Sequence, residues 1–152
     1  MKNRAAAKER EAYMKILRSS EDYLEAMLVL KQNKGYIRSA DVADLLNVSR
    51  PSVSAAVKKL RENGYLTMDE ASMITLTESG RSIAERIYER HRVLTTIFRG
   101  IGVDPVTART DACKVEHDIS DRTFRALCDY AKQFPADAGS LEDVQAVIQD
   151  RN

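Results

Sequence analysis

Residues 39–77, SADVADLLNVSRPSVSAAVKKLRENGYLTMDEASMITLT, contain the pattern that decides the fold. Apolar residues at helical spacing within 39–48 predict a short helix. After a tight turn, Ser49 opens a second helix, and Pro51 lies in its first turn, where a missing N–H group costs nothing; Gly64 closes this helix. The rest of the stretch alternates apolar and polar residues, which predicts a two-stranded wing. We therefore expect a winged helix-turn-helix.

The second helix of this unit is the candidate recognition helix. Its N-terminal end carries small polar side chains, and in such domains this end enters the major groove of DNA. Lysines further along the helix are expected to meet phosphates, which gives affinity and salt dependence rather than sequence choice. The alternative is a three-helix core whose hairpin packs against something other than DNA. The predicted DNA-binding residues are Ser49, Arg50, Pro51, Ser52, Ser54, Lys58 and Lys59.

Helical patterns continue on both sides of this unit. Ser19 and Ser20 precede apolar residues at helical spacing, so they predict the N-cap of a helix that ends at Gly35. Further helices are predicted over 78–99, around Cys113, over 124–134 and over 140–150. The fold is therefore expected to be mainly α.

Composition restricts the class of protein. The chain has 152 residues, of which 43% are hydrophobic and 31% charged, as in a globular protein with a real core. No apolar run is long enough to span a bilayer, and the basic N-terminus lacks the pattern of a secretion signal, so a cytoplasmic location is expected. Cys113 and Cys128 are far apart in the sequence and do not form a disulfide framework.

The net charge of +1 conceals an asymmetry along the chain. Residues 1–18 carry six basic and two acidic side chains, whereas residues 111–152 carry five basic and nine acidic ones. A basic front suits phosphate contact, and an acidic rear suits cations or self-association, although solvated helix faces look the same. The basic segment is either a longer first helix or a disordered tail.

Cys113, Glu116 and His117 stand at i, i+3 and i+4, so on a helix their side chains leave one face within a single turn. This is a spacing of metal ligands. His91 lies in a helical stretch upstream, and the pair Asp22 and Glu25 lies near the start of the chain. Three helices are therefore expected to converge on a divalent ion.

Each of these residues also has a simpler interpretation. Asp22, three residues after Ser19, would complete an N-terminal capping box, and Glu25 would be an exposed helix charge. His91, flanked by arginines, would be a surface histidine, and Cys113 a small buried apolar residue. Cys128 is interpreted as packing rather than ligation.

Several motifs resemble the DtxR/MntR family of metal-dependent transcriptional repressors. They are EDYLEAMLVL (21–30), GYIRSADVADLLNVSRPSVSAAVKKLRENGYL (35–66), LTESG (76–80), YERHRVL (88–94), IGVD (101–104) and CKVEHDIS (113–120). The helix-turn-helix block is shared with other winged-helix regulators, whereas RHRVL together with CxxEH is much more specific. The resemblance implies a basic N-terminal extension over 1–19, a winged helix-turn-helix DNA-binding domain over 20–78 and an α-helical metal-binding and dimerisation domain over 79–152.

The resemblance also implies a set of metal ligands. These are Asp22, Glu25, His91, Cys113, Glu116 and His117. The carboxylates suit Mn²⁺ and the thiolate shifts preference toward softer ions, so Mn²⁺ or Fe²⁺ is expected, with Zn²⁺ or Co²⁺ also binding in vitro. Thr95 and Arg109 replace the residues of the ancillary site of iron-type members, so that second site is expected to be absent, although a second ion sharing ligands with the first remains open.

Together these features predict a metal-dependent DNA-binding transcriptional regulator that represses metal-ion uptake genes. Mn²⁺ or Fe²⁺ would bridge the two domains and favour the dimer that binds the operator. The expected partners are palindromic double-stranded DNA and a second copy of the chain, with no membrane and no small-molecule substrate. The apolar stripe Ile83, Ile87, Leu94 and Phe98 is the predicted dimer face, unless it is an internal core stripe.

Two other functions compete with this prediction. A winged-helix regulator that answers to a small organic ligand would keep the DNA-binding half without any response to metal. A metal-dependent enzyme would use Glu116 as a base beside the ion. The sequence has no evident glycine loop for a substrate and no nucleophile paired with a histidine, so it is not expected to be an enzyme.

Overall fold

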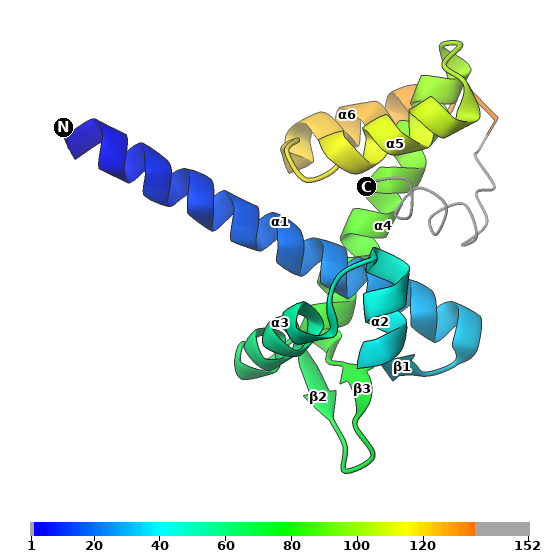
Figure 1. Cartoon of the computed structure of the whole chain (residues 1–152). Helices are drawn as coiled ribbons and strands as arrows, with labels where there is room; N and C mark the ends of the chain where they lie inside the picture. The colour runs from blue at the N-terminus through cyan, green and yellow to red at the C-terminus, as the bar shows by residue number, and fades with distance from the viewer. Residues whose placement is uncertain (1, 136–152) are drawn as a thin grey trace.

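The computed structural model describes residues 2–135, with side chains described at 4–8 and 18–135. Helices dominate, and a small sheet lies at one end of the molecule (Figure 1). The elements in chain order are α1 (Lys2–Lys34), β1 (Ile37–Arg38), α2 (Ser39–Leu46), α3 (Arg50–Glu62), β2 (Leu66–Met68), β3 (Met73–Leu76), α4 (Glu78–Gly100), α5 (Pro105–Val115) and α6 (Asp121–Ala131). This order confirms the mainly α fold with a winged helix-turn-helix in its first half.

The helix-turn-helix forms as the sequence predicts. Ser49 is the N-cap of α3, and its hydroxyl accepts a hydrogen bond of 3.3 Å from the backbone N–H of Ser52. Asn47, the C-cap of α2, adopts a left-handed conformation that turns the chain between the two helices. The buried faces of α2 and α3 pack into the core, so the exposed face of α3 remains available for a partner.

The wing contains one strand more than expected. β2 and β3 form the predicted hairpin, and the two-residue strand β1 pairs with β3 on its other edge, so the antiparallel order is β1-β3-β2. The sequence hides β1 because it is too short to show alternation. Its residue Ile37 is buried and lies opposite Ile74, which joins the wing to the core.

The first helix does not begin where the sequence analysis placed it. α1 runs without interruption from Lys2 to Lys34, so Ser19 and Ser20 lie inside a helix and cap nothing. The predicted N-cap is therefore wrong, and of the two interpretations of the basic segment the longer first helix is confirmed. In Figure 1 the N-terminal part of α1 projects from the body of the molecule.

The core is built around the second half of α1. All seven residues from Leu24 to Leu30 are buried, and apolar residues of α2, α3 and the sheet pack against them. A helix that is apolar on all sides belongs at the centre of a fold. α1 also packs along α4, so it touches both halves of the molecule.

The start of α4 is pressed against the wing at Gly80. A Cβ atom at this position would lie 2.0 Å from the carbonyl oxygen of Tyr65. The backbone N–H of Thr77 donates to this same carbonyl at 3.1 Å, and Thr77 is also the N-cap of α4. Neither of the two backbone segments can therefore move easily. Gly80 therefore fixes the joint between the DNA-binding half and the long helix.

We expect Gly80→Ala to lower the free energy of unfolding by about 3 kcal/mol, because overpacking against rigid backbone is costly. Urea unfolding in the presence of chelator measures this loss. Ser82→Ala, an exposed position in the next part of the same helix, is the control and should change stability by no more than about 0.5 kcal/mol. Equal stability of Gly80→Ala and the wild type would contradict the close approach of Gly80 to the carbonyl oxygen of Tyr65.

The apolar stripe of α4 faces the interior of the protomer. Ile87 and Leu94 are only 1% and 2% exposed, and Ile83 packs against the core. The prediction that this stripe forms the dimer face is therefore wrong, and its alternative, an internal core stripe, holds. Periodicity reports which face is buried but not whether the neighbour is the same chain.

After α4, the described residues of the C-terminal half form α5 and α6, which pack along α4. Asp104 and Ser120 cap these two helices by accepting hydrogen bonds from backbone N–H groups. The helix expected over 140–150 lies outside the described residues. In the described part of the chain, no helix combines the length and the apolar character needed to cross a membrane.

Candidate metal centre

The structure brings the six predicted donor residues together from three segments. Asp22 and Glu25 extend from α1 and His91 from α4. The other three are Cys113 in the last turn of α5 and Glu116 and His117 directly after it. The ligand atoms of five of the six residues, all except Glu25, form two groups, and within each group all atoms lie within 4.8 Å of one another. The groups are His91 with Cys113 and Glu116, and Asp22 with Glu116 and His117.

The first group is buried between α4 and α5. The Nδ1 atom of His91 lies 3.0 Å from Oε2 of Glu116 and 3.4 Å from Sγ of Cys113. Glu116 has no exposed surface, and His91 is 4% exposed. A carboxylate, a thiol and an imidazole therefore share one dry location, where a charged group requires a partner of opposite charge.

The second group joins α1 to the segment after α5. The Nε2 atom of His117 lies 2.9 Å from Oδ1 of Asp22 and 3.4 Å from Oε1 of Glu116. α5 ends at Val115, so Glu116 is its C-cap and His117 lies in the turn beyond. The three side chains expected to share one helical face therefore divide between two groups, and only Glu116 belongs to both.

Glu25 is a further buried carboxyl group beside both groups. It is 4% exposed, and its Oε1 atom is buried without a hydrogen-bond partner among the described residues. Burial first, and then the nearby carboxylate of Glu116, raise the pKa of Glu25 to about 8. Burial by itself would lower the pKa of His117, but contacts with Asp22 and Glu21 outweigh burial and raise that pKa to about 10.

The chemistry of this donor set fits a divalent cation. Three carboxylates, two imidazoles and a thiol converge where desolvation is severe, and the unsatisfied Oε1 atom of Glu25 requires a positive charge or a proton. Acidic and imidazole ligands at this density match first-row divalent ions. A purely structural cluster would pair its acids with arginine or lysine, as Arg90 of α4 pairs with Asp121 at the start of α6.

The structure overturns three of the simpler interpretations. Asp22 lies inside a continuous helix, so it completes no capping box. Glu25 is not an exposed charge, and His91 is not a surface histidine. Cys113 is buried as its alternative required, but its sulfur also lies beside the imidazole of His91.

Two residues near the donors were missed by the sequence analysis. Glu21 has a carboxylate 2.7 Å from Nδ1 of His117. Arg90 is buried and donates to the backbone carbonyls of Glu116 and Ile119, so it holds the end of α5 against α4. Glu21 directly precedes a donor, and Arg90 precedes another, but adjacent residues on a helix face different directions, so nothing in the sequence pointed to these contacts.

The predicted DNA-binding residues all lie on the exposed side of α3 or at its N-terminus. The hydroxyl groups of Ser49 and Ser52 lie 2.7 Å apart and form a hydrogen bond with each other. At the tip of the wing, Asp69 accepts hydrogen bonds from the N–H groups of Ala71 and Met73, each at 2.9 Å. Asp69 thus stabilises the turn at the tip of the wing.

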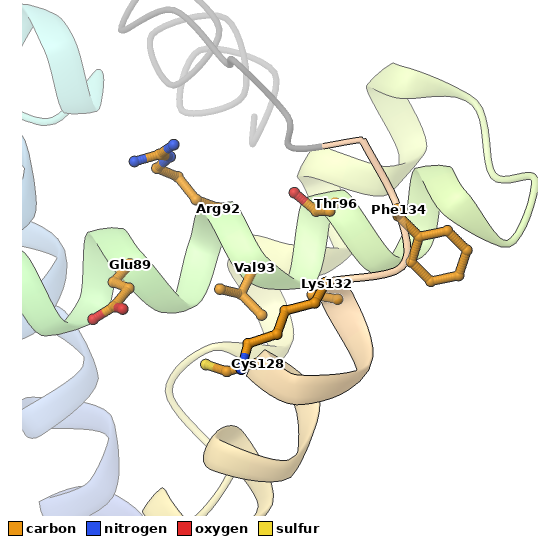
Figure 2. A pocket seen from close by; sticks show the side chains of 8 residues that line it. Glu89, Arg92, Val93, Thr96, Cys128, Lys132 and Phe134 are labelled. Carbon is orange, nitrogen blue, oxygen red and sulfur yellow. The ribbon is translucent and has the colours of Figure 1, made fainter.

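A separate cavity of about 430 Å³ lies between α4 and α6 (Figure 2). Cys128 is half-buried and lines this cavity, and its interpretation as a packing residue stays a prediction. None of the six donors lines this cavity.

Both halves of the chain match known protein families. Residues 15–72 match the family model described as iron dependent repressor, N-terminal DNA binding domain. Residues 77–139 match the model described as iron dependent repressor, metal binding and dimerisation domain. The HTH-type transcriptional regulator MntR of Geobacillus kaustophilus (strain HTA426) is 35% identical over 134 residues, which cover 88% of this chain and 94% of that protein.

Solved structures give the same result. A structure of T. acidophilum IdeR is 29% identical with a TM-score of 0.65, and the match covers 72% of this chain and 52% of that one. A manganese-dependent transcriptional repressor in complex with manganese is 28% identical with a TM-score of 0.67, over 76% of this chain and 53% of that one. The chain thus spans about half the length of these two structures.

A winged helix-turn-helix joined to a helical half with a cluster of buried metal donors defines a class, the metal-responsive DNA-binding regulators. The matches in sequence and structure are more specific. The chain belongs to the DtxR/MntR family of metal-dependent transcriptional repressors. Its two halves correspond to the DNA-binding and the metal-binding and dimerisation domains of that family.

Proposed function

We propose that this protein represses genes for metal-ion uptake when Mn²⁺ or Fe²⁺ occupies the cluster formed by Asp22, Glu25, His91, Cys113, Glu116 and His117. The convergence of these side chains from α1, α4 and the end of α5 is the observation that carries the proposal. DNA binding by α3 and dimerisation through the C-terminal half follow from family membership.

The donor chemistry narrows the choice of ion. The carboxylates of Asp22, Glu25 and Glu116 favour the hard ion Mn²⁺, whereas the thiol of Cys113 favours Fe²⁺, Co²⁺ or Zn²⁺. Zn²⁺ binds most such sites tightly in vitro, so tight Zn²⁺ binding would not identify the physiological signal. One solved relative is a manganese-dependent transcriptional repressor, and another, ScaR, was solved with Zn²⁺ and with Cd²⁺ bound, which is in line with a site that accepts several ions.

Two ions per chain are compatible with the donors. The two groups of ligand atoms share only Glu116, whose Oε2 faces His91 and whose Oε1 faces His117. A carboxylate with its two oxygens directed to different groups is suited to bridging. We therefore expect a stoichiometry of one or two ions, with Glu116 common to both.

Regulation would act through the relative position of the two halves. Asp22 and Glu25 belong to the helix that forms the core of the DNA-binding half, and the other donors belong to the C-terminal half. When all six residues bind the same cation or pair of cations, α1 is held against α4 and α5. In a two-fold dimer this fixes the spacing of the two α3 helices on half-sites of a palindromic operator, about one DNA turn apart.

The coupling free energy that this regulation requires is modest. A hundredfold rise in DNA affinity corresponds to about 2.7 kcal/mol of coupling between the metal site and the DNA site. A second copy of the chain would dock on the C-terminal half, where Ile101, Val106 and Tyr130 are exposed in the protomer.

We expect Lys58→Ala and Lys59→Ala each to reduce by about one the slope of log affinity for DNA against log salt concentration, because each removes one phosphate contact. Fluorescence anisotropy at several salt concentrations measures the slope. Lys132→Ala is the control. This exposed lysine is the C-cap of α6 in the C-terminal half, where it pairs with Asp129. An unaltered slope in both α3 variants would remove these lysines from the interface.

Calorimetric titration of chelator-treated protein with Mn²⁺, and anaerobically with Fe²⁺, tests the proposed function. The wild type should bind one or two ions per chain, and His91→Ala should lose this binding while it keeps its circular dichroism spectrum. Failure of both ions to bind the wild type would leave a winged-helix regulator with a different signal, such as a small organic ligand. Full binding by His91→Ala would mean that the site is misassigned.

A further inference from the structure

Glu21 lies next to the donor cluster but is not part of it. Its Oε2 atom is 2.7 Å from Nδ1 of His117, across the junction between α1 and the turn that follows α5. The side chain of His117 is almost fully buried, with 3% exposure, and that of Glu21 is 19% exposed. The contact is therefore well shielded from water, and it occupies the nitrogen of His117 that points away from the donors.

We propose that Glu21 is the positioning residue for His117: it holds the ring so that Nε2 faces Asp22 and Glu116 and can bind the cation. This inference rests on the proposed function. An ionised carboxylate only accepts hydrogen bonds, so the ring hydrogen must be on Nδ1. The lone pair of a neutral His117 then lies on Nε2, the nitrogen at 2.9 Å from Asp22 and 3.4 Å from Glu116.

A carboxylate that orients a metal-binding histidine also makes the imidazole a stronger donor. Loss of such a partner typically weakens metal binding about 10- to 100-fold, although the partner never touches the ion. Without Glu21 the ring of His117 would be able to rotate, and the hydrogen could move to Nε2. That tautomer cannot bind a cation through the nitrogen that faces the cluster.

Glu21 is itself held in place by α4. Its Oε1 atom lies 3.4 Å from the guanidinium of Arg86, so its two oxygens serve two different partners. Arg86 lies on α4 five residues before His91, and thus links the carboxylate to the helix that carries another donor. The orientation of His117 is therefore set jointly by α1 and α4.

The chain offers a matched control for this role. Arg18, one turn before Glu21 on α1, donates to the backbone carbonyl of Lys114 and lies 3.6 Å from Asp118. It joins the same two segments as Glu21 does. It touches none of the six donors, so its loss weakens the junction without affecting the orientation of His117.

The test compares Glu21→Ala, Glu21→Gln and Arg18→Ala in the full-length chain. Calorimetry with Mn²⁺ measures the affinity, and ¹⁵N NMR of the histidine rings in the Zn²⁺-loaded protein identifies which nitrogen of His117 carries the hydrogen. We expect Glu21→Ala to bind Mn²⁺ about 10- to 100-fold more weakly. Glu21→Gln should recover most of this loss, because its amide oxygen still accepts from Nδ1, and Arg18→Ala should stay within about threefold of the wild type.

Several results would overturn the inference. They are wild-type affinity in Glu21→Ala, equal losses in the Ala and Gln variants, which would indicate a charge effect alone, or a hydrogen on Nε2 of His117 in the wild type. If Glu21→Ala does not fold, Glu21→Asp replaces it, since the shorter side chain withdraws the acceptor and keeps the charge. Absence of metal binding in the wild type itself would instead overturn the proposed function, so the two failures are distinguishable.

Discussion

Replacement of Glu116 by alanine is expected to remove the response to metal altogether. The wild type should bind its operator about a hundredfold more tightly with Mn²⁺ than with chelator, which corresponds to about 2.7 kcal/mol. Glu116→Ala should bind equally weakly in both conditions. The reason is geometric: Glu116 is the one residue common to both groups of donors, so its loss disables each of them.

Anisotropy measurements on operator DNA selected with the wild type provide the test, and circular dichroism verifies the fold. Asp111→Ala is the control, because this residue lies on the same helix α5 and pairs with Lys114 rather than with any donor. The control should keep the full response. A response of wild-type size in Glu116→Ala would exclude Glu116 from the ligands and with it the proposal of a shared carboxylate.

Local sequence patterns predicted most of the fold. The cap at Ser49 and the long helix α4 depend on residues close together in the chain, and the structure has both. The local prediction failed at the start of α1. Ser19 and Ser20 are good capping residues, yet α1 continues through them, because a cap signal does not stop a helix whose preceding residues also favour helix.

The site shows the same limit. Residue types and spacing were enough to select six candidate donors; the structure brings five of them into the two groups and buries Glu25 beside them. Spacing did not show that His117 turns away from Cys113 toward α1, because α5 ends at Val115 and the chain changes direction there. Glu21 and Arg90 were missed for a similar reason, since their roles arise only from contacts with segments 96 and 26 residues away.

Glu25→Gln is expected to stabilise the chelator-treated protein at pH 8 by several kcal/mol and to have little effect near pH 4.5. Burial raises the pKa of Glu25 from 4.5 to about 8 in the folded protein, and each pKa unit corresponds to about 1.4 kcal/mol. Below pH 4.5 the carboxyl group is protonated in both states. As the pH rises, the unfolded chain loses this proton first, so ionisation favours unfolding until the folded pKa is passed near pH 8. A glutamine never ionises and avoids this cost.

Urea unfolding across pH 4.5–8.5 measures the difference, and Glu85→Gln serves as the control because Glu85 lies exposed on α4 beside Arg81. The control should follow the wild type at every pH, and a Glu25→Gln curve parallel to that of the wild type would contradict the raised pKa. With Mn²⁺ present the order should reverse, since a bound ion stabilises the folded state in proportion to its affinity and the variant has lost a ligand. A buried carboxylate that destabilises the chelated protein and stabilises the loaded one makes folding itself respond to metal. This reversal distinguishes a sensor site from an acidic cluster that is merely tolerated.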